Sequence, residues 1–162
     1  MRMKKLYAAY GSNLNHAQMA YRCPDATVYG TAELKGHELL FRGSPTSAVA
    51  TVEPKEGGSV PILLWEISKR DEHSLDRYEG WPSFYGKEQK DFQLESGETV
   101  SAMVYVMTPG RALGSPSGYY YATIEEGYHD CGFDTEILEQ AREHSEELAV
   151  QEQGSSPAFR MW

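Results

Sequence analysis

The chain has 162 residues, of which 40% are hydrophobic and 12% are aromatic. This is enough apolar side chain for one domain with a single core, and it excludes a mainly disordered protein. The 24 acidic and 15 basic residues give a formal net charge of −9, and this sign repels phosphate backbones and argues against a nucleic-acid partner.

The first predicted element is a short strand that ends in a glycine turn. Residues 7–10 are apolar or aromatic and suit a buried strand, and Gly11 lets the backbone bend or approach a bound group without a Cβ in the way. The amides of this turn would form a small cradle for an anion or oxyanion, with short polar contacts from Ser12 and Asn13. The same residues also fit an ordinary tight turn.

The next segment is predicted to be one capped helix followed by several short strands. Asn15 is in position to cap a helix over residues 16–21. Glycine and proline then separate stretches rich in strand-forming residues. The four predicted strands are residues 26–32, 38–41, 48–52 and 60–67.

A second helix is the best-defined element of the sequence. Ser68 and Asp71 have the spacing of a capping box, which predicts a helix over residues 69–79 that ends at Gly80. Two strands follow, over residues 85–94 and 99–107. Residues 109–118, rich in glycine and proline, predict a surface loop that would serve as a lid.

The last third of the chain changes to a helical period. Apolar residues recur with helical spacing from Phe133 to Ala149, which predicts an amphipathic helix that packs on the sheet and has Asp134 as its N-cap. Residues 1–150 are therefore expected to form a single domain and residues 151–162 a C-terminal tail. Either Phe159 and Trp162 dock this tail onto the domain, or the tail is frayed. Strands with segregated helices predict the α+β class and a sheet that curls toward a small barrel.

The sequence predicts no metal, cofactor, disulfide or membrane segment. Cys23 and Cys131 lie far apart and are expected to be reduced thiols, and the five histidines lack metal-ligand spacing. No apolar stretch reaches the roughly 20 residues that cross a bilayer, and the N-terminus lacks the apolar core of a signal peptide. We therefore expect a cytoplasmic protein with no membrane partner; aromatic residues in the tail permit a homodimer without requiring one.

Glu79 is the candidate acid/base residue. Leu75 and Glu79 are four residues apart and so lie on one helical face beside Tyr78, whereas Asp76 and Arg77 are expected to face solvent. A carboxyl group in apolar surroundings has a raised pKa and can both accept and donate a proton. The alternative is that Glu79 tilts outward from the last turn, since glutamate is rarely buried.

Several motifs in order resemble the γ-glutamylcyclotransferase-like family, over roughly residues 6–140. The chief motifs are Tyr10-Gly11-Ser12-Asn13-Leu14, Leu75-Asp76-Arg77-Tyr78-Glu79-Gly80 and Pro116-Ser117-x-x-Tyr120. The resemblance implies a small mixed β-barrel with peripheral helices, a pocket at the Gly11 loop and no metal. It also implies a small-molecule γ-glutamyl substrate that is cyclised to 5-oxoproline with release of an amine or amino acid.

Matched residue by residue, the resemblance assigns a role to eight positions. Glu79 matches the family's catalytic glutamate, and Tyr85 and Tyr120 match pocket tyrosines, although a shift of one residue would bring Tyr119 or Tyr121 inward instead. The substrate-binding loop corresponds to Tyr10, Gly11, Ser12, Asn13 and Leu14.

Three other functions are alternatives to the cyclotransferase. The chain would be a binding or regulatory module if it kept the pocket without catalysis. It would be a hydrolase if Ser12 or a cysteine were a nucleophile, but Ser12 lacks a Gly-x-Ser-x-Gly elbow and neither cysteine has a visible activating partner. The third alternative is a phosphate-binding protein with its site at Gly11, but the Gly-Lys-Ser/Thr sequence of a phosphate-binding loop does not follow this residue.

Overall fold

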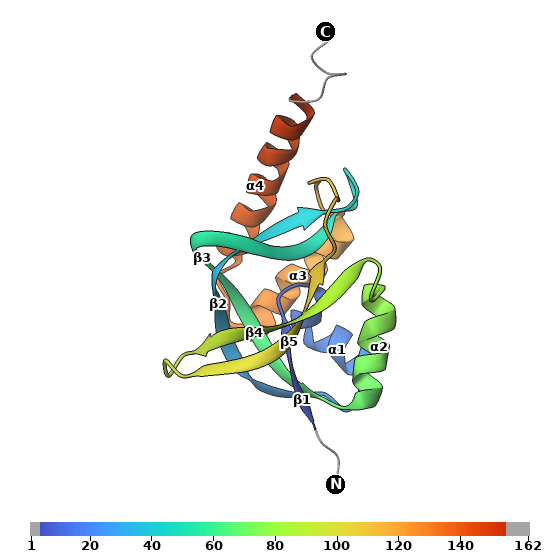
Figure 1. Cartoon of the computed structure of the whole chain (residues 1–162), viewed down its shortest axis with the longest axis vertical. Coiled ribbons are helices and arrows are strands. Elements are labelled where there is room, and N and C mark those ends of the chain that lie inside the picture. The colour runs from blue at the N-terminus through green and yellow to red at the C-terminus, as the bar shows by residue number, and fades with distance from the viewer. Residues whose placement is uncertain (1–3, 155–162) are drawn as a thin grey trace.

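The computed structural model describes residues 4–154, and its centre is a closed β-barrel (Figure 1). Neighbouring strands in the order β1-β3-β2-β4-β5 are antiparallel, and β1 closes the barrel by pairing parallel to β5. The strands are β1 (Lys5–Ala9), β2 (Thr27–Arg42), β3 (Val49–Ile67), β4 (Tyr85–Leu94) and β5 (Thr99–Met107). The barrel and its outer helices confirm the α+β class and the mixed barrel.

The helices of this part of the chain lie outside the barrel, and the α-helices among them begin at side-chain caps. They are α1 (His16–Arg22), α2 (Lys69–Glu79), α3 (Gly118–Cys131) and α4 (Thr135–Gly154), with the short 3₁₀ helix η1 (Ser12–Leu14) before α1. The Asn15 side chain accepts from the Gln18 amide at 3.1 Å, and the Asp134 carboxylate accepts from the Glu136 amide at 3.0 Å. Both predicted caps are confirmed.

The four short strands predicted over residues 26–67 are wrong as separate elements, because they form two long strands. The ladder between β2 and β3 shifts register between Val28 and Gly30 and again between Lys35 and His37. Glycine is common at such bulges because it weakens regular pairing and tolerates unusual backbone angles. The residues that looked like strand ends are therefore irregularities within continuous strands.

Helix α3 was not predicted, and part of the loop before it is not exposed. The Ser117 side chain accepts from the Tyr120 amide at 3.2 Å and starts the helix. In the loop, Leu113 and Gly114 are buried, and the Gly114 amide donates to the Phe41 carbonyl at 3.1 Å. The predicted surface loop is thus wrong for its second half; a lid function for the exposed first half stays a prediction.

Helix α4 packs on the barrel through a small buried face, as predicted. Leu138 and Ser145 have no exposed surface, and the Ser145 hydroxyl accepts from the Phe41 amide at 3.0 Å. The helix continues into the predicted tail as far as Gly154, and Phe159 and Trp162 lie outside the described residues. Within residues 4–154, none of the helices combines the length and apolar character needed to cross a membrane.

Candidate active site

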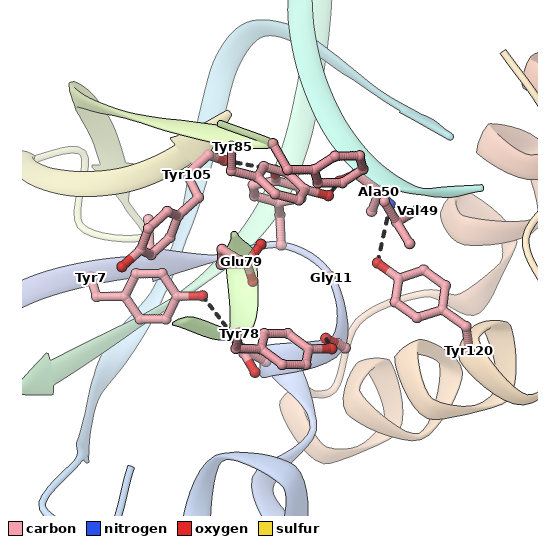
Figure 2. Close-up of a pocket in the computed structure, with 14 residues that line it drawn as sticks. Tyr7, Gly11, Val49, Ala50, Tyr78, Glu79, Tyr85, Tyr105 and Tyr120 are labelled. Atoms are coloured by element: carbon pink, nitrogen blue, oxygen red, sulfur yellow. Dashed lines mark hydrogen bonds between the residues drawn. The ribbon is translucent and has the colours of Figure 1, made fainter. Parts of the chain in front are cut away.

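A cavity of about 220 Å³ lies at one end of the barrel, between the loop after β1 and the end of α2 (Figure 2). Its walls come from β1 and the loop after it, β3, α2, the start of β4 with the residue before it, β5 and α3. Half of the lining residues are aromatic. Its six tyrosines are Tyr7, Tyr10, Tyr78, Tyr85, Tyr105 and Tyr120.

Glu79 is the acidic residue of this cavity, and Figure 2 shows its carboxylate among the tyrosines. Burial raises the pKa of Glu79 to about 7, and the positive charge of Arg22 partly opposes this shift. Within residues 4–154, no hydrogen bond or ion pair engages the Glu79 carboxylate, so it is available to a bound molecule. A carboxyl group with this pKa is half ionised at neutral pH and suits proton transfer in both directions.

The start and end of α2 fix the position of Glu79. The Ser68 and Asp71 side chains form the predicted capping box, and Gly80 ends the helix in the left-handed conformation, with φ = 67°. The Trp81 amide donates to the Asp76 carbonyl at 2.9 Å and closes the last turn. Glu79 is therefore the last helical residue, and the chain turns away behind it.

Asp76 does not face solvent, contrary to the sequence-based expectation. Its carboxylate accepts from the Tyr105 hydroxyl at 2.6 Å and pairs with Lys87 at 2.8 Å. Lys87 also pairs with Glu72 at 2.8 Å. These contacts fasten α2 to β4 and β5, one turn before Glu79.

The Gly11 loop forms the opposite wall. A Cβ on Gly11 would lie 3.3 Å from the Ala50 Cβ and 3.5 Å from the Tyr120 hydroxyl, so glycine keeps this part of the cavity open. The Leu14 amide donates to the Gly11 carbonyl at 3.0 Å, which leaves the earlier amides of Ser12 and Asn13 without a partner inside the turn. These amides suit an oxyanion or a carboxylate.

The side chains of the loop do not all face the cavity. The Ser12 hydroxyl shares a hydrogen bond with the Tyr78 hydroxyl at 3.0 Å, at the cavity wall. The Asn13 side chain also lines the cavity, but its polar atoms are bonded to Tyr7 and Arg22. Leu14 is fully buried outside the lining, against Gly127 of α3, so the structure does not bring it to the site.

Tyr10, Tyr85 and Tyr120 line the cavity and attach their hydroxyls to the backbone. Tyr10 donates to the Tyr105 carbonyl at 2.7 Å, and Tyr85 donates to the Ala50 carbonyl at 2.5 Å. The Tyr120 hydroxyl accepts from the Ala50 amide at 3.0 Å.

The three consecutive tyrosines of α3 lie in different surroundings. Tyr119 is 81% exposed, and Tyr121 packs against Arg142, whose Cζ lies 4.5 Å from the ring centroid. Tyr120 is the one that reaches the cavity, in the position that the family motif implies.

Three lining tyrosines were missed as site residues, namely Tyr7, Tyr78 and Tyr105. Tyr7 and Tyr105 come together because β1 pairs with β5, and their rings meet edge to face at a centroid distance of 5.9 Å. Only the strand pairing could have identified them. Tyr78 was noted beside Glu79, and its position in the last turn of α2 was the available signal.

The other candidate groups are placed differently. Burial raises the pKa of Cys23 and of Cys131 to about 12, so both thiols are poor nucleophiles at neutral pH. Trp81 is 43% exposed and lies outside the cavity lining, whereas Phe84 lines the cavity. No group of three or more histidine, cysteine or acidic side chains in residues 4–154 is arranged to hold a metal ion.

Comparisons with known proteins agree with this geometry. The family model described as gamma-glutamyl cyclotransferase, AIG2-like, matches residues 7–126. The chain is 30% identical over 140 residues to the gamma-glutamylcyclotransferase of Bos taurus, across 81% of this chain and 73% of that protein.

Solved structures show the same architecture. One, titled gamma-glutamyl cyclotransferase, has a TM-score of 0.78 and 25% identity, with 92% of this chain and 99% of that chain covered. A Homo sapiens protein titled uncharacterized protein loc79017 has a TM-score of 0.77 and 29% identity, with 85% and 86% covered. The chain therefore belongs to the AIG2-like gamma-glutamyl cyclotransferase family.

Proposed function

We propose that this protein is a γ-glutamyl cyclotransferase, in which Glu79 is the general acid/base. The substrate is a γ-glutamyl amine or γ-glutamyl amino acid, and the products are 5-oxoproline and the free amine or amino acid. The observation that carries the proposal is the Glu79 carboxylate in a cavity lined by tyrosines, opposite the Gly11 loop. The family membership supports it.

The reaction needs only proton transfers and a held conformation of the substrate. The substrate's α-ammonium group gives a proton to Glu79, and the resulting amine attacks the γ-carbonyl carbon to form the new C–N bond of a five-membered lactam. Glu79 then protonates the leaving nitrogen as the old C–N bond breaks. The second proton of the attacking nitrogen passes to the regenerated Glu79 carboxylate and from there to the released amine or to water, which leaves the neutral lactam. Because the attack is intramolecular, the folded conformer and the stabilised oxyanion supply most of the rate enhancement.

The pKa of Glu79 suits this transfer. Moving a proton from an amine of pKa ~8 to an ordinary glutamate of pKa ~4.3 costs about 5 kcal/mol. With the pKa of Glu79 at about 7, the same transfer costs only about 1.4 kcal/mol. The carboxylate then remains ionised often enough at neutral pH to act as the base.

Different residues of the cavity lining would bind different parts of the substrate. The amides of Ser12 and Asn13 would hold the oxyanion or the substrate carboxylate, and the Ser12 hydroxyl would assist. Tyr10, Tyr85 and Tyr120 use their hydroxyls on the backbone and would offer ring faces to the glutamyl chain. The site is therefore compact and suits a small molecule. The cytoplasmic location and the homodimer stay predictions.

The test is the Glu79→Gln variant, assayed for 5-oxoproline release on a panel of γ-glutamyl amino acids and γ-glutamyl amines. We expect wild-type turnover of at least one member and loss of turnover in the variant, with unchanged circular dichroism. Near wild-type rates in the variant would refute Glu79 as the acid/base. Saturable binding of 5-oxoproline by the wild type without any turnover would instead support a binding module.

A further inference from the structure

Arg22 lies behind the cavity wall and contacts both sides of the candidate site. Its guanidinium donates from Nη1 to Asn13 Oδ1 at 2.6 Å, on the loop side. The same group stacks on the Tyr78 ring, with Cζ 3.5 Å from the ring centroid, on the side of α2 that carries Glu79. Arg22 is itself outside the cavity lining, so it acts on the site through these neighbours.

The contact with Asn13 fixes the orientation of its amide group. A guanidinium can only donate hydrogen bonds, so the atom of Asn13 that faces Arg22 has to be the oxygen. The NH₂ group then faces Tyr7 and donates to the Tyr7 hydroxyl at 3.0 Å, the bond that begins at Tyr7 in Figure 2. The Trp65 indole donates to the Asn13 carbonyl at 3.0 Å and holds the backbone in place.

The direction of this second bond determines what Tyr7 can offer to a ligand. Because its oxygen accepts from Asn13, its own proton is free to point elsewhere, and Tyr7 lines the cavity near Glu79. Burial and the nearby Glu79 hold the pKa of Tyr7 well above its ordinary value, so the proton stays in place at neutral pH.

We propose that Arg22 is a positioning residue that sets the direction of the Arg22–Asn13–Tyr7 hydrogen bonds, so that Tyr7 donates its proton to an oxygen of the bound substrate. The natural acceptor is the γ-carbonyl oxygen as it becomes an oxyanion. This inference rests on the proposed function and adds a donor to the loop amides.

An Asn13→Asp variant tests the direction of the bonds without removing them. A carboxylate only accepts, so Asp at position 13 accepts from both Arg22 and Tyr7, and the Tyr7 proton turns away from the cavity. Loss of one oxyanion donor lowers turnover by about 10²- to 10³-fold in other enzymes, and we expect a loss of this order. Tyr7→Phe is expected to give a similar loss, and the double variant no further loss.

The new carboxylate also moves the pKa of Glu79, so rates are compared on the plateau of each pH profile. Arg22→Met, which removes the charge and the donor, is expected to lower the plateau and to shift the acidic limb to higher pH. Arg22→Lys, which keeps a donor and a charge, is expected to recover part of both effects. Tyr21→Phe, on the same helix at a position 88% exposed, is the control and is expected to match the wild type.

Three results would overturn the proposal: a plateau in Asn13→Asp within about threefold of the wild type, additive losses in the double variant, or no recovery by Arg22→Lys. These results are distinct from failure of the proposed function, which is absence of wild-type turnover. If the wild type shows no turnover, the role of Tyr7 is tested by calorimetry, as the affinity of the wild type and the variants for 5-oxoproline. Equal affinity in the wild type, Tyr7→Phe and Asn13→Asp, or no binding by the wild type, rejects the role of Tyr7.

Discussion

The Tyr120 hydroxyl on α3 accepts a hydrogen bond from the Ala50 amide of β3 at 3.0 Å, and both residues line the cavity. This bond joins an outer helix to the barrel wall. Ala50 is 2% exposed, so water does not replace a lost partner easily.

Tyr120→Phe is expected to destabilise the protein by about 1–3 kcal/mol, the usual cost of a buried amide without a partner. The variant should also raise KM, because the ring is no longer anchored at the cavity. Chemical denaturation and steady-state kinetics measure the two effects. Tyr119→Phe, at a position 81% exposed, is the control, and an equal loss in both variants would contradict the assignment.

The pH dependence of kcat/KM should report Glu79. The base form is the ionised carboxylate, so activity is expected to fall about tenfold per pH unit below the pKa of about 7 and to level off above it, until the substrate's own groups titrate. The acidic limb is measured from pH 4 to 9 with constant ionic strength. A limb centred near pH 4.5, the ordinary value for glutamate, would show that burial does not perturb this carboxylate.

The raised pKa of Glu79 also costs stability. The folded protein holds its proton up to about pH 7, whereas the unfolded chain releases it near 4.5. The unfolded state therefore binds fewer protons between these values, and this carboxyl group lowers the free energy of unfolding as the pH rises from about 4.5 to 7. The total, at about 1.4 kcal/mol per pH unit, is at most about 3 kcal/mol.

Glu79→Gln is consequently expected to be more stable than the wild type at pH 8, by up to about 3 kcal/mol, and no more stable at pH 4. Urea denaturation at the two pH values measures this difference. A variant less stable than the wild type at pH 8 would show that the carboxylate makes favourable contacts in the fold.

Gly11→Ala is expected to raise KM without a large loss of stability. The new methyl group would lie 3.3 Å from the Ala50 Cβ and beside the Tyr120 hydroxyl, so it narrows the cavity where the substrate binds. Gly118→Ala, at a position with open space around it, is the matched control. Affinity for 5-oxoproline is the direct measurement, and equal affinity in both variants would place the ligand elsewhere.

Gly127→Ala tests the packing that holds the loop. A Cβ at this position would lie 2.7 Å from both the Leu14 Cβ and the Asn15 amide nitrogen, so α3 would have to move away from η1. Overpacking of this kind typically costs about 1–3 kcal/mol. The variant is expected to lose stability by that amount, measured by denaturation, and a wild-type midpoint would show that α3 adapts without strain.

The sequence predicted best the elements whose signals are local. The capping box at Ser68 and the glycine at position 80 gave the bounds of α2, because both act within one or two turns. The strands β4 and β5 were predicted with their observed bounds. The bulge near Gly36 falls in the predicted gap between the strands 26–32 and 38–41, since sequence alone does not show whether a neighbouring strand continues to pair.

The site was predictable where it follows a helix face or the family motif, and not where it depends on strand pairing. Glu79 was found from its spacing to Leu75, and Tyr120 from the motif. Tyr7 and Tyr105 are 98 residues apart and meet only through the parallel pairing of β1 and β5, which no local pattern reveals. Leu14 shares the motif but packs in the core, because η1 turns its side chain toward α3.

The walls of the cavity come from segments at residues 7–13, 49–50, 78–85, 105 and 120. No fragment of the chain holds more than a part of them, so the cavity exists only after the barrel has closed. A ligand must then bind the native state alone and oppose global unfolding by RT ln(1 + [L]/Kd). The thermal shift produced by a γ-glutamyl compound therefore reports complete folding in those variants that leave the cavity lining unchanged, such as Gly127→Ala and the exposed controls.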